Sequence, residues 1–396
     1  MRERSPQEDP GDALCDALIA LCGSLSPGAV WPGERLALCG SWLRLTELAR
    51  RHGLAPALCP SGELPAAAIP ADLLVSWKRR RQAQFAKSAC AVNQLEEIAA
   101  AFAEAGTPFI ALKGAAAILW LYEEIECREV GDLDLLVPPA AMESARQTMA
   151  GLGYATISAS TSPEDERVQM HLPSYEKPGC LPVQLHRRIL AGRDRQGRVT
   201  RAVWEGTVTE SLGSASVRRL SWPHFLLHTA AHFTVHLRAD SASLKGMADM
   251  ILAVRKWGDP INWGNFWRTA AQWGILRDVA TAASTLNHHW GLSIPGVPPG
   301  ARPLPAGVLV FGGEQVGSAS LEHYWNRLAA AQELPGLSSR IRYVLRLLFP
   351  TPEHLRWRYH VPEGKTIAPY YFLYPFARVG RLAKDFAAVI RPTRRG

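Results

Sequence analysis

The segment Gly131-Asp132-Leu133-Asp134-Leu135-Leu136-Val137 places two aspartates two residues apart inside an apolar run. The run is too short for a helix, so we predict a strand over about 132–137. Side chains alternate along a strand, and Asp132 and Asp134 therefore point to the same side. Two carboxylates held this close repel each other unless a cation lies between them. Mg²⁺ (or Mn²⁺) prefers such oxygen ligands and often binds together with phosphates, so the pair predicts a metal–nucleotide site. A strand with an exposed acidic edge is the alternative explanation.

The residues on both sides of this segment predict an α/β unit. Pro108-Phe109-Ile110-Ala111-Leu112 has the composition of a buried strand, and Lys113-Gly114 then opens an alanine-rich helix that runs to about Tyr122. A second helix follows Pro138 and ends at Gly151. We predict further strands at about 154–159, 169–176 and 181–187, of which the last two pair with each other.

Helical sequence flanks this unit on both sides. Leucines recur at helical spacing before residue 106, where the longest predicted helix covers about 71–105. After Trp222, helices are predicted at 224–238, 243–257 and 263–276. We therefore expect a helical N-terminal region at 1–106, an α/β catalytic domain at 107–220 and a C-terminal helical domain at 221–396.

Composition narrows the class of protein. The chain has 396 residues, a net charge of +8 and 47% hydrophobic residues, which suits a folded protein with an anionic partner but does not choose that partner. Seven cysteines without a Cys-x-x-Cys pair predict free thiols in a reducing cytoplasm. The first residues lack the apolar core of a signal peptide, and no apolar run reaches the length of a membrane span.

The motifs together resemble one branch of the nucleotidyltransferase superfamily, the uncharacterised nucleotidyltransferase family. Members of that branch show a Leu-Lys-Gly turn, then an Arg, then Gly-Asp-x-Asp-Leu-Leu-Val. In this chain the corresponding residues are Leu112-Lys113-Gly114, Arg128 and 131–137. The likeness extends over about 35–280 and includes the segments 151–154, 228–232 and 245–249.

The resemblance implies an α+β fold in which a mixed sheet is packed with helices, and it implies roles for the motif residues. Asp132 and Asp134 would hold Mg²⁺ (or Mn²⁺) bridging the triphosphate of an NTP donor. Lys113, Gly114 and Arg128 would hold phosphates, because glycine lets the backbone approach phosphate oxygens and arginine grips them by two bonds. For Arg128, a structural pairing with Asp132 or Asp134 is the alternative. Some members accompany genes for modified peptides, lasso peptides among them, so a peptide is one implied acceptor.

One position departs from the family pattern. The branch usually has Val-Glu-x-His, whereas this chain reads Val183-Gln184-Leu185-His186. In the superfamily this third carboxylate helps to bind metal and deprotonates the acceptor. Gln184 can bind a ligand or water but cannot act as a base at neutral pH. Either His186 or Glu176 substitutes for it, or the enzyme is slow or inactive.

Two other functions remain open from the sequence. Many glycosyltransferases hold Mn²⁺ and a nucleotide sugar with an Asp-x-Asp motif, and Gln184 is compatible with a catalytically weak module that binds a peptide or a partner protein. A nucleic-acid acceptor is not expected, because the basic residues are scattered and no known binding motif accompanies them.

Three histidines, His228, His232 and His236, recur every four residues and share one face of a predicted helix. A zinc site would need further ligands that the sequence does not show, so packing histidines are the preferred interpretation. Asp249 is predicted to pair with one of them across two helices.

Overall fold

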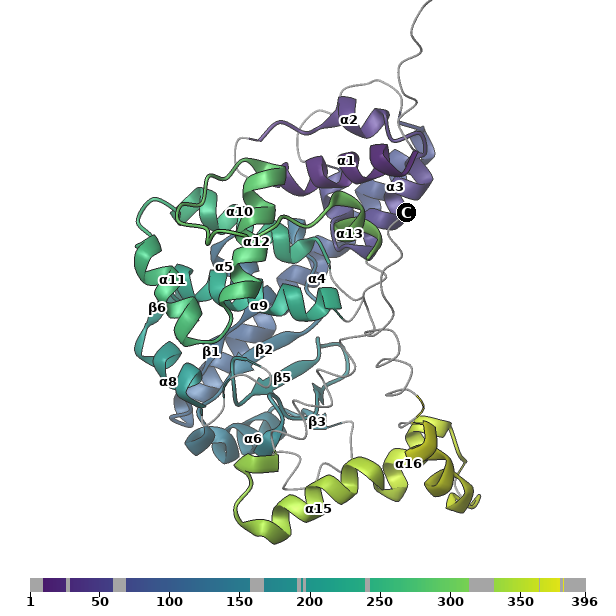
Figure 1. The fold of residues 1–396 in the computed structure, drawn as a ribbon, viewed down its shortest axis with the longest axis vertical. Helices are drawn as coiled ribbons and strands as arrows, with labels where there is room; N and C mark the ends of the chain where they lie inside the picture. Colours follow the sequence, from purple (N-terminus) through teal and green to yellow (C-terminus); the bar gives the residue numbers. More distant parts are fainter. Residues whose placement is uncertain are drawn as a thin grey trace, which may run out of the picture.

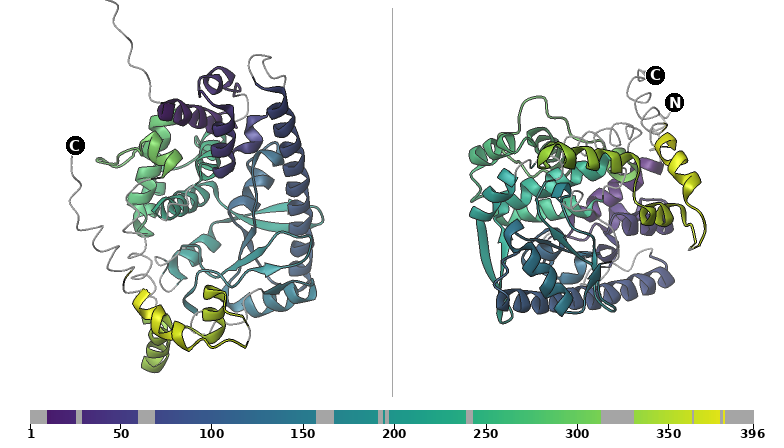
Figure 2. Two further views of the ribbon diagram at one scale, coloured as in Figure 1. Left: turned by 90° about the vertical axis from the view of Figure 1, so that its right-hand side faces the viewer. Right: turned by 90° about the horizontal axis from the view of Figure 1, so that it is seen from below.

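The structure is a computed structural model that describes residues 10–25, 29–59, 69–156, 167–190, 194, 197–238, 243–312, 331–362, 364–377 and 380. It has the predicted α+β architecture, with one sheet between two layers of helices (Figures 1 and 2). No helix in these ranges is both long enough and apolar enough to cross a membrane.

Seven strands form one mixed sheet among the described residues, in the order β3-β4-β5-β2-β1-β7-β6. The central strand β2 pairs in parallel with β5 and antiparallel with β1, while β1 pairs in parallel with β7. The strands are β1 (Ile110–Ala111), β2 (Leu133–Leu136), β3 (Ala155–Thr156), β4 (Tyr175–Glu176), β5 (Val183–His186), β6 (Thr207–Leu212) and β7 (Ala215–Leu220).

The hairpin of β6 and β7 was not predicted from the sequence. Its two strands are joined through Gly213 and Ser214, and Leu212 pairs with Ala215 across this turn. Gly213 has a φ of +56°, a conformation that glycine adopts without steric cost. A glycine–serine pair between two short runs is a hairpin signal, and it was available in the sequence.

One face of the sheet packs against α4 (Ala71–Glu104) and α6 (Met142–Gly151). Leu133 and Leu135 of β2 lie in this core with Leu95 and Phe102 of α4. Figure 2 shows α4 as a long helix on this side of the sheet, and the α4 residues in the sheet core are those from Ala91 to Phe102. The shorter helices between α4 and the end of the sheet, in chain order, are α5 (Lys113–Trp120), η2 (Ile125–Cys127), η3 (Pro139–Ala141) and α8 (Arg198–Glu205).

The other face of the sheet packs against helices from both ends of the sequence. Leu136 of β2 lies in a core built from N-terminal and C-terminal helices, and the Trp290 indole donates a hydrogen bond to the carbonyl of Ile19 at 2.9 Å. These helices are α1 (Pro10–Gly23), α2 (Gly33–Ala37), α3 (Trp42–Arg51), η1 (Ala55–Leu58), α9 (Trp222–Arg238), α10 (Lys245–Trp257), α11 (Trp263–Gln272), α12 (Leu276–Trp290) and α13 (Ala306–Phe311).

The two flanking regions are therefore joined in space, although 114 residues separate 1–106 from 221–396 in the predicted division. Beyond them lie η5 (Ala331–Glu333), α15 (Gly336–Leu348), α16 (Pro352–Tyr359) and a helical stretch at 368–377. In Figure 1, α15 and α16 lie apart from the other helices, at the bottom of the molecule.

Candidate functional site

The two aspartates lie on the side of the sheet that faces the mixed helical layer. Asp134 belongs to β2 and sits opposite Gln184 of the parallel strand β5. Asp132 directly precedes β2, so it is two residues from Asp134 and on the same side. Asp134 is buried, whereas Asp132 is half-buried and lines the same cavity.

Asp134 is held by two nitrogen donors. The Nε2 atom of His186 lies 2.6 Å from Asp134 Oδ1, and Lys113 Nζ donates to the same oxygen at 3.1 Å. Burial alone would raise the pKa of Asp134, but the hydrogen bond from His186 and the charge of Lys113 outweigh burial and lower it well below its usual range. For Asp132, burial and the neighbouring charge of Asp134 raise the pKa. Asp132 and Asp134 therefore repel each other, and the positive charge of Lys113 only partly offsets that repulsion.

The Lys-Gly turn adopts a strained backbone at the cavity wall. Lys113 has a φ of +47°, which is unusual for a residue with a side chain, and it is the first residue of α5. The Leu112 N–H donates to the Asp134 carbonyl at 3.0 Å, so the turn is tied to the acidic strand. Lys113 and Gly114 both line the cavity, and the first N–H groups of α5 are the kind that favour anions.

Gln184 and His186 occupy different places, although both belong to β5. Gln184 lines the cavity, and its Nε2 donates to Asp132 Oδ2 at 3.2 Å. His186 is only 1% exposed and does not line the cavity. Its imidazole therefore holds Asp134 by a hydrogen bond from the protein interior, away from the cavity. Glu176, the other predicted substitute for the third carboxylate, is exposed on β4 and does not line the cavity either.

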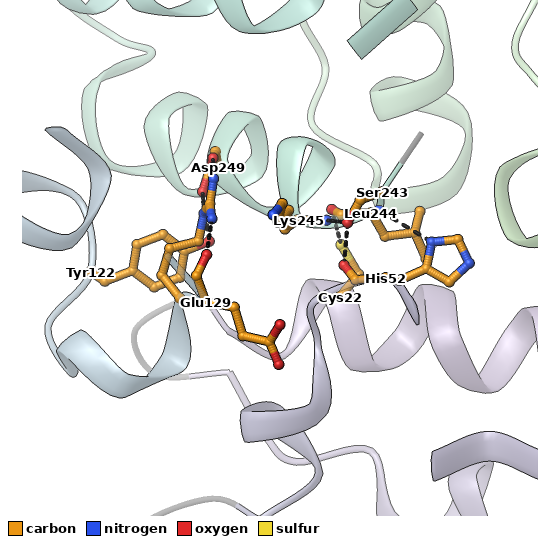
Figure 3. A network of polar contacts seen from close by, with 9 residues as sticks. Cys22, His52, Tyr122, Glu129, Ser243, Leu244, Lys245 and Asp249 are labelled. Atoms are coloured by element: carbon orange, nitrogen blue, oxygen red, sulfur yellow. Dashed lines mark hydrogen bonds and ion pairs between the residues drawn. The ribbon is translucent and has the colours of Figure 1, made fainter. Parts of the chain in front are cut away.

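Arg128 makes a buried ion pair with Asp249 of α10. Its Nε and Nη2 donate to Asp249 Oδ1 and Oδ2 at 2.8 and 2.9 Å, and the Tyr122 hydroxyl donates to Oδ1 at 2.9 Å. Figure 3 shows Asp249 above the Tyr122 ring. The alternative considered for Arg128, a pairing with Asp132 or Asp134, is thereby not the one found, and the predicted pairing of Asp249 with a histidine of α9 is wrong. The pairing joins residues 121 apart, which no local spacing reveals.

Arg128 has N–H groups beyond those that bond to Asp249. A third N–H, on Nη1, donates to the carbonyl of Glu129. A guanidinium has five N–H donors, so two remain beyond these contacts, and the side chain lines the cavity. Burial lowers the pKa of Arg128, but the charge and hydrogen bonds of Asp249, with the charges of Tyr122 and Asp132, together outweigh burial and raise that pKa, so the guanidinium stays protonated.

The cavity that these residues share has a volume of about 560 Å³. It lies where the end of α3, the Lys-Gly turn, the acidic strand and helices α9 and α10 meet. Three of its basic residues were not predicted, namely Arg50, Arg51 and Lys245. In the sequence, the segment around Lys245 is distinguished only by its resemblance to the family pattern at 245–249.

Lys245 is positioned by a polar network with the N-terminal helical region. Its backbone N–H donates to the His52 carbonyl at 3.2 Å, and the Ser243 hydroxyl donates to the same carbonyl. Figure 3 shows Lys245 on its helix between Asp249 and Ser243. Burial, followed by the charge of Arg128, lowers the pKa of Lys245. The cavity thus gathers several cations, a suitable surface for a polyphosphate.

The histidines of α9 face the same region. His232 and His236 line the cavity and their Nε2 atoms are 3.1 Å apart, while His228 is buried with its Nδ1 atom unpartnered. Burial lowers the pKa of His232 well below its ordinary value, and Lys113 lowers it further. All three are therefore packing or cavity-lining imidazoles, and the described residues contain no cluster of three or more metal-ligating side chains.

We expect His228 to make the protein sensitive to acid. Burial lowers the pKa of His228 to about 3, and Lys113 adds to the shift. The unfolded chain takes up this proton near pH 6.5 and the folded chain does not, so stability falls as the pH drops from 6.5 towards 3. At pH 5 this one group lowers the free energy of unfolding by about 2 kcal/mol.

His228→Met should lose less free energy of unfolding between pH 7 and pH 5 in urea titrations, whereas the exposed control His288→Met should behave as wild type. Equal losses in both variants would contradict the assignment.

The two aspartates fit a divalent cation that arrives with a nucleotide. Four carboxylates line the cavity, namely Glu129, Asp132, Asp134 and Asp249, and Asp249 is bonded to Arg128 and Tyr122. Asp132 and Asp134 lie on the same side of one strand, and burial together with the charge of Asp134 raises the pKa of Asp132. Hard cations take carboxylate oxygens together with phosphates and water. Two carboxylates are too few for a cation held by protein side chains alone. The donor set therefore suits Mg²⁺ or Mn²⁺ shared with a triphosphate.

The family model described as uncharacterised nucleotidyltransferase matches residues 39–291, which is more than half of the 396-residue chain. The matched range includes every residue that lines the cavity, from Arg50 to Asp249. Comparison with curated proteins and with solved structures finds no match.

Proposed function

The chain belongs to the uncharacterised nucleotidyltransferase family, and from that premise we propose that it transfers a nucleoside monophosphate from an NTP to a hydroxyl or phosphate group of an acceptor. The family predicted from the Lys-Gly and Asp-x-Asp motifs is confirmed, and nucleotidyl transfer is the general activity that it supports. The observation that carries the proposal is the contact between Lys113 and Asp134, which joins the turn and the acidic pair at one cavity.

The donor triphosphate is assigned to the cations of the cavity. Lys113 and the first N–H groups of α5 would bind phosphate oxygens, and Arg128 has donors left to add a directed contact. Gly114 lines the cavity beside Arg128: a Cβ atom there would be in ordinary van der Waals contact with Val130 and Arg128, at 3.6 and 3.7 Å. Arg50, Arg51 and Lys245 supply the remaining positive charge.

Asp132 and Asp134 would hold the divalent cation, and Gln184 would orient Asp132 through its amide. The cation would neutralise charge on the transferring and leaving phosphates. The hydrogen bond from His186 would keep Asp134 ionised and fix its orientation. His186 would therefore act on a metal-binding carboxylate and would not contact the acceptor.

The acceptor base is assigned to His232. Gln184 cannot take a proton and His186 does not reach the cavity, whereas His232 lines it and is neutral at neutral pH because burial lowers its pKa. An acceptor hydroxyl would give its proton to His232 as its oxygen attacks the α-phosphorus, and pyrophosphate would leave. A triphosphate beside Lys113 would also cancel the charge that depresses the pKa of His232, making it a stronger base.

We expect His232→Gln to lower kcat about 10²-fold, the scale of a general base, with little change in the KM for NTP. The measurement is the release of pyrophosphate with each NTP and Mg²⁺, with Gln184→Glu assayed beside it. A His232→Gln enzyme as fast as wild type would refute the assignment. If wild type is inactive and Gln184→Glu turns over, the chain is instead a catalytically weak binding module.

The proposals for the acceptor and for the cellular location rest on the family and on the cysteines. We propose a peptide acceptor, as the linkage of some members to modified-peptide genes implies, and a cytoplasmic location, since all seven cysteines are free thiols. Mass spectrometry separates this from the glycosyltransferase alternative, because an acceptor gains a nucleotide in one case and a hexose in the other.

A further inference from the structure

The C-terminal helices expose a run of large apolar side chains. In α15, Leu337, Ile341 and Leu345 follow one another at four-residue spacing and are 72%, 49% and 50% exposed. Residues four apart lie on one side of a helix, so they form a continuous stripe. We call the stripe, together with the other exposed large apolar side chains described in 349–376, the C-terminal apolar face. The remaining members are Phe349, Phe372, Leu373 and Phe376.

The same helix has a second side that anchors it. Tyr343 and Leu347 are buried in a small core with Leu334, and Val168 packs against that core. Because α15 is held on this side, the apolar stripe stays directed outward. Figure 1 shows α15 and α16 at one end of the molecule, away from the helices that surround the cavity.

The charge of the protein is concentrated in the same part of the chain. Residues 336–396 contain twelve Lys and Arg but only three Asp and Glu, whereas residues 1–335 contain 32 basic and 33 acidic residues. All of the net positive charge therefore resides in the C-terminal 61 residues. Arg342 and Arg346 follow the stripe along α15 itself.

The family match does not explain this segment. It ends at residue 291, so neither the C-terminal apolar face nor the excess of basic residues in the sequence from 336 onward belongs to the part that the family shares. Nucleotidyl transfer at the cavity needs neither feature. An exposed apolar surface bordered by cations is instead typical of a surface that binds another partner.

We propose that the C-terminal apolar face binds the surface of an anionic lipid bilayer. Leucine, isoleucine and phenylalanine side chains would enter the boundary between headgroups and acyl chains, while the arginines and lysines contact anionic headgroups. A nucleic acid would match the charge but not the aliphatic stripe. An acidic surface on another protein would leave most of these apolar side chains exposed.

The test is co-sedimentation of the full chain with vesicles. We expect binding to mixed phosphatidylcholine–phosphatidylglycerol vesicles, little binding to phosphatidylcholine alone, and weaker binding as salt is raised. The triple variant Leu337→Ser, Ile341→Ser, Leu345→Ser should bind at least about tenfold more weakly, because three apolar side chains no longer leave water. The matched control substitutes Leu43, Val75 and Phe85, exposed on α3 and α4, by serine and should bind as wild type.

Three outcomes would overturn the proposal. Binding that does not depend on lipid charge would exclude the basic residues as a cause. An equal loss in the control variant would show that the position of the apolar residues is unimportant. A wild-type dimer that the Leu337/Ile341/Leu345 variant converts to a monomer would make the face an interface between two copies. Thermal melts of both variants verify that the fold is intact.

Discussion

Asp134→Asn should reduce nucleotidyl transfer by at least about 10³-fold, the largest effect that we expect from a single substitution. An amide is a poorer ligand for a divalent cation and no longer balances Lys113, so the charge of the transferring phosphates would lose its main neutralising group. The measurement is NMP transfer and pyrophosphate release with each NTP and Mg²⁺. Calorimetric titration should also show that NTP binding loses its dependence on Mg²⁺.

A buried carboxylate outside the cavity is the matched control. Asp194 is 1% exposed and accepts hydrogen bonds from the backbone N–H groups of Val199 and Thr200 at 2.8 and 3.0 Å. Asp194→Asn should lower the thermal midpoint and leave the transfer rate of the folded enzyme unchanged. If Asp134→Asn transfers NMP at the wild-type rate, the acidic pair is not the metal site and the proposed function fails.

Asp249→Ala should lower the free energy of unfolding by about 3–5 kcal/mol. Removing one member of a buried ion pair leaves the other charge without its partner at a position where the surrounding protein has displaced most of its water. Here the orphaned groups are the Arg128 guanidinium and the Tyr122 hydroxyl, both buried and both bonded to Asp249. Urea titration at neutral pH measures the change.

Two further variants test whether the loss of stability in Asp249→Ala comes from the burial of the ion pair. Glu210→Ala breaks an ion pair of similar length, 2.6 Å to Arg219, whose acidic side chain is 32% exposed, and it should cost no more than about 1 kcal/mol. Arg128→Met combined with Asp249→Leu should recover most of the stability lost in Asp249→Ala, since neither charge is then buried. If this stable double variant binds NTP as wild type does, Arg128 is structural and holds no phosphate.

The sequence predicted the central part of the fold because that part depends on local pattern. The apolar run with two aspartates predicted a strand at 132–137, and the structure has β2 at 133–136. The long helix predicted at 71–105 is α4, which covers 71–104. The strands predicted at 169–176 and 181–187 pair as β4 and β5, though only at Tyr175 and Val183. The segment 198–220 was missed, because α8 is short and the polar residues of β6 weaken its alternation.

The sequence by itself determined which residues carry the chemistry on one strand and one turn: Asp132, Asp134, Lys113 and Gly114. Alternation and helix-start rules act over a few residues, so they place such groups without further information. Only the tertiary structure decided that Arg128 pairs with Asp249, that His186 supports Asp134 from behind, and that Arg50 and Lys245 reach the same cavity. These contacts join segments up to about 200 residues apart, and their formation depends on how helices pack across a sheet, which local spacing does not encode.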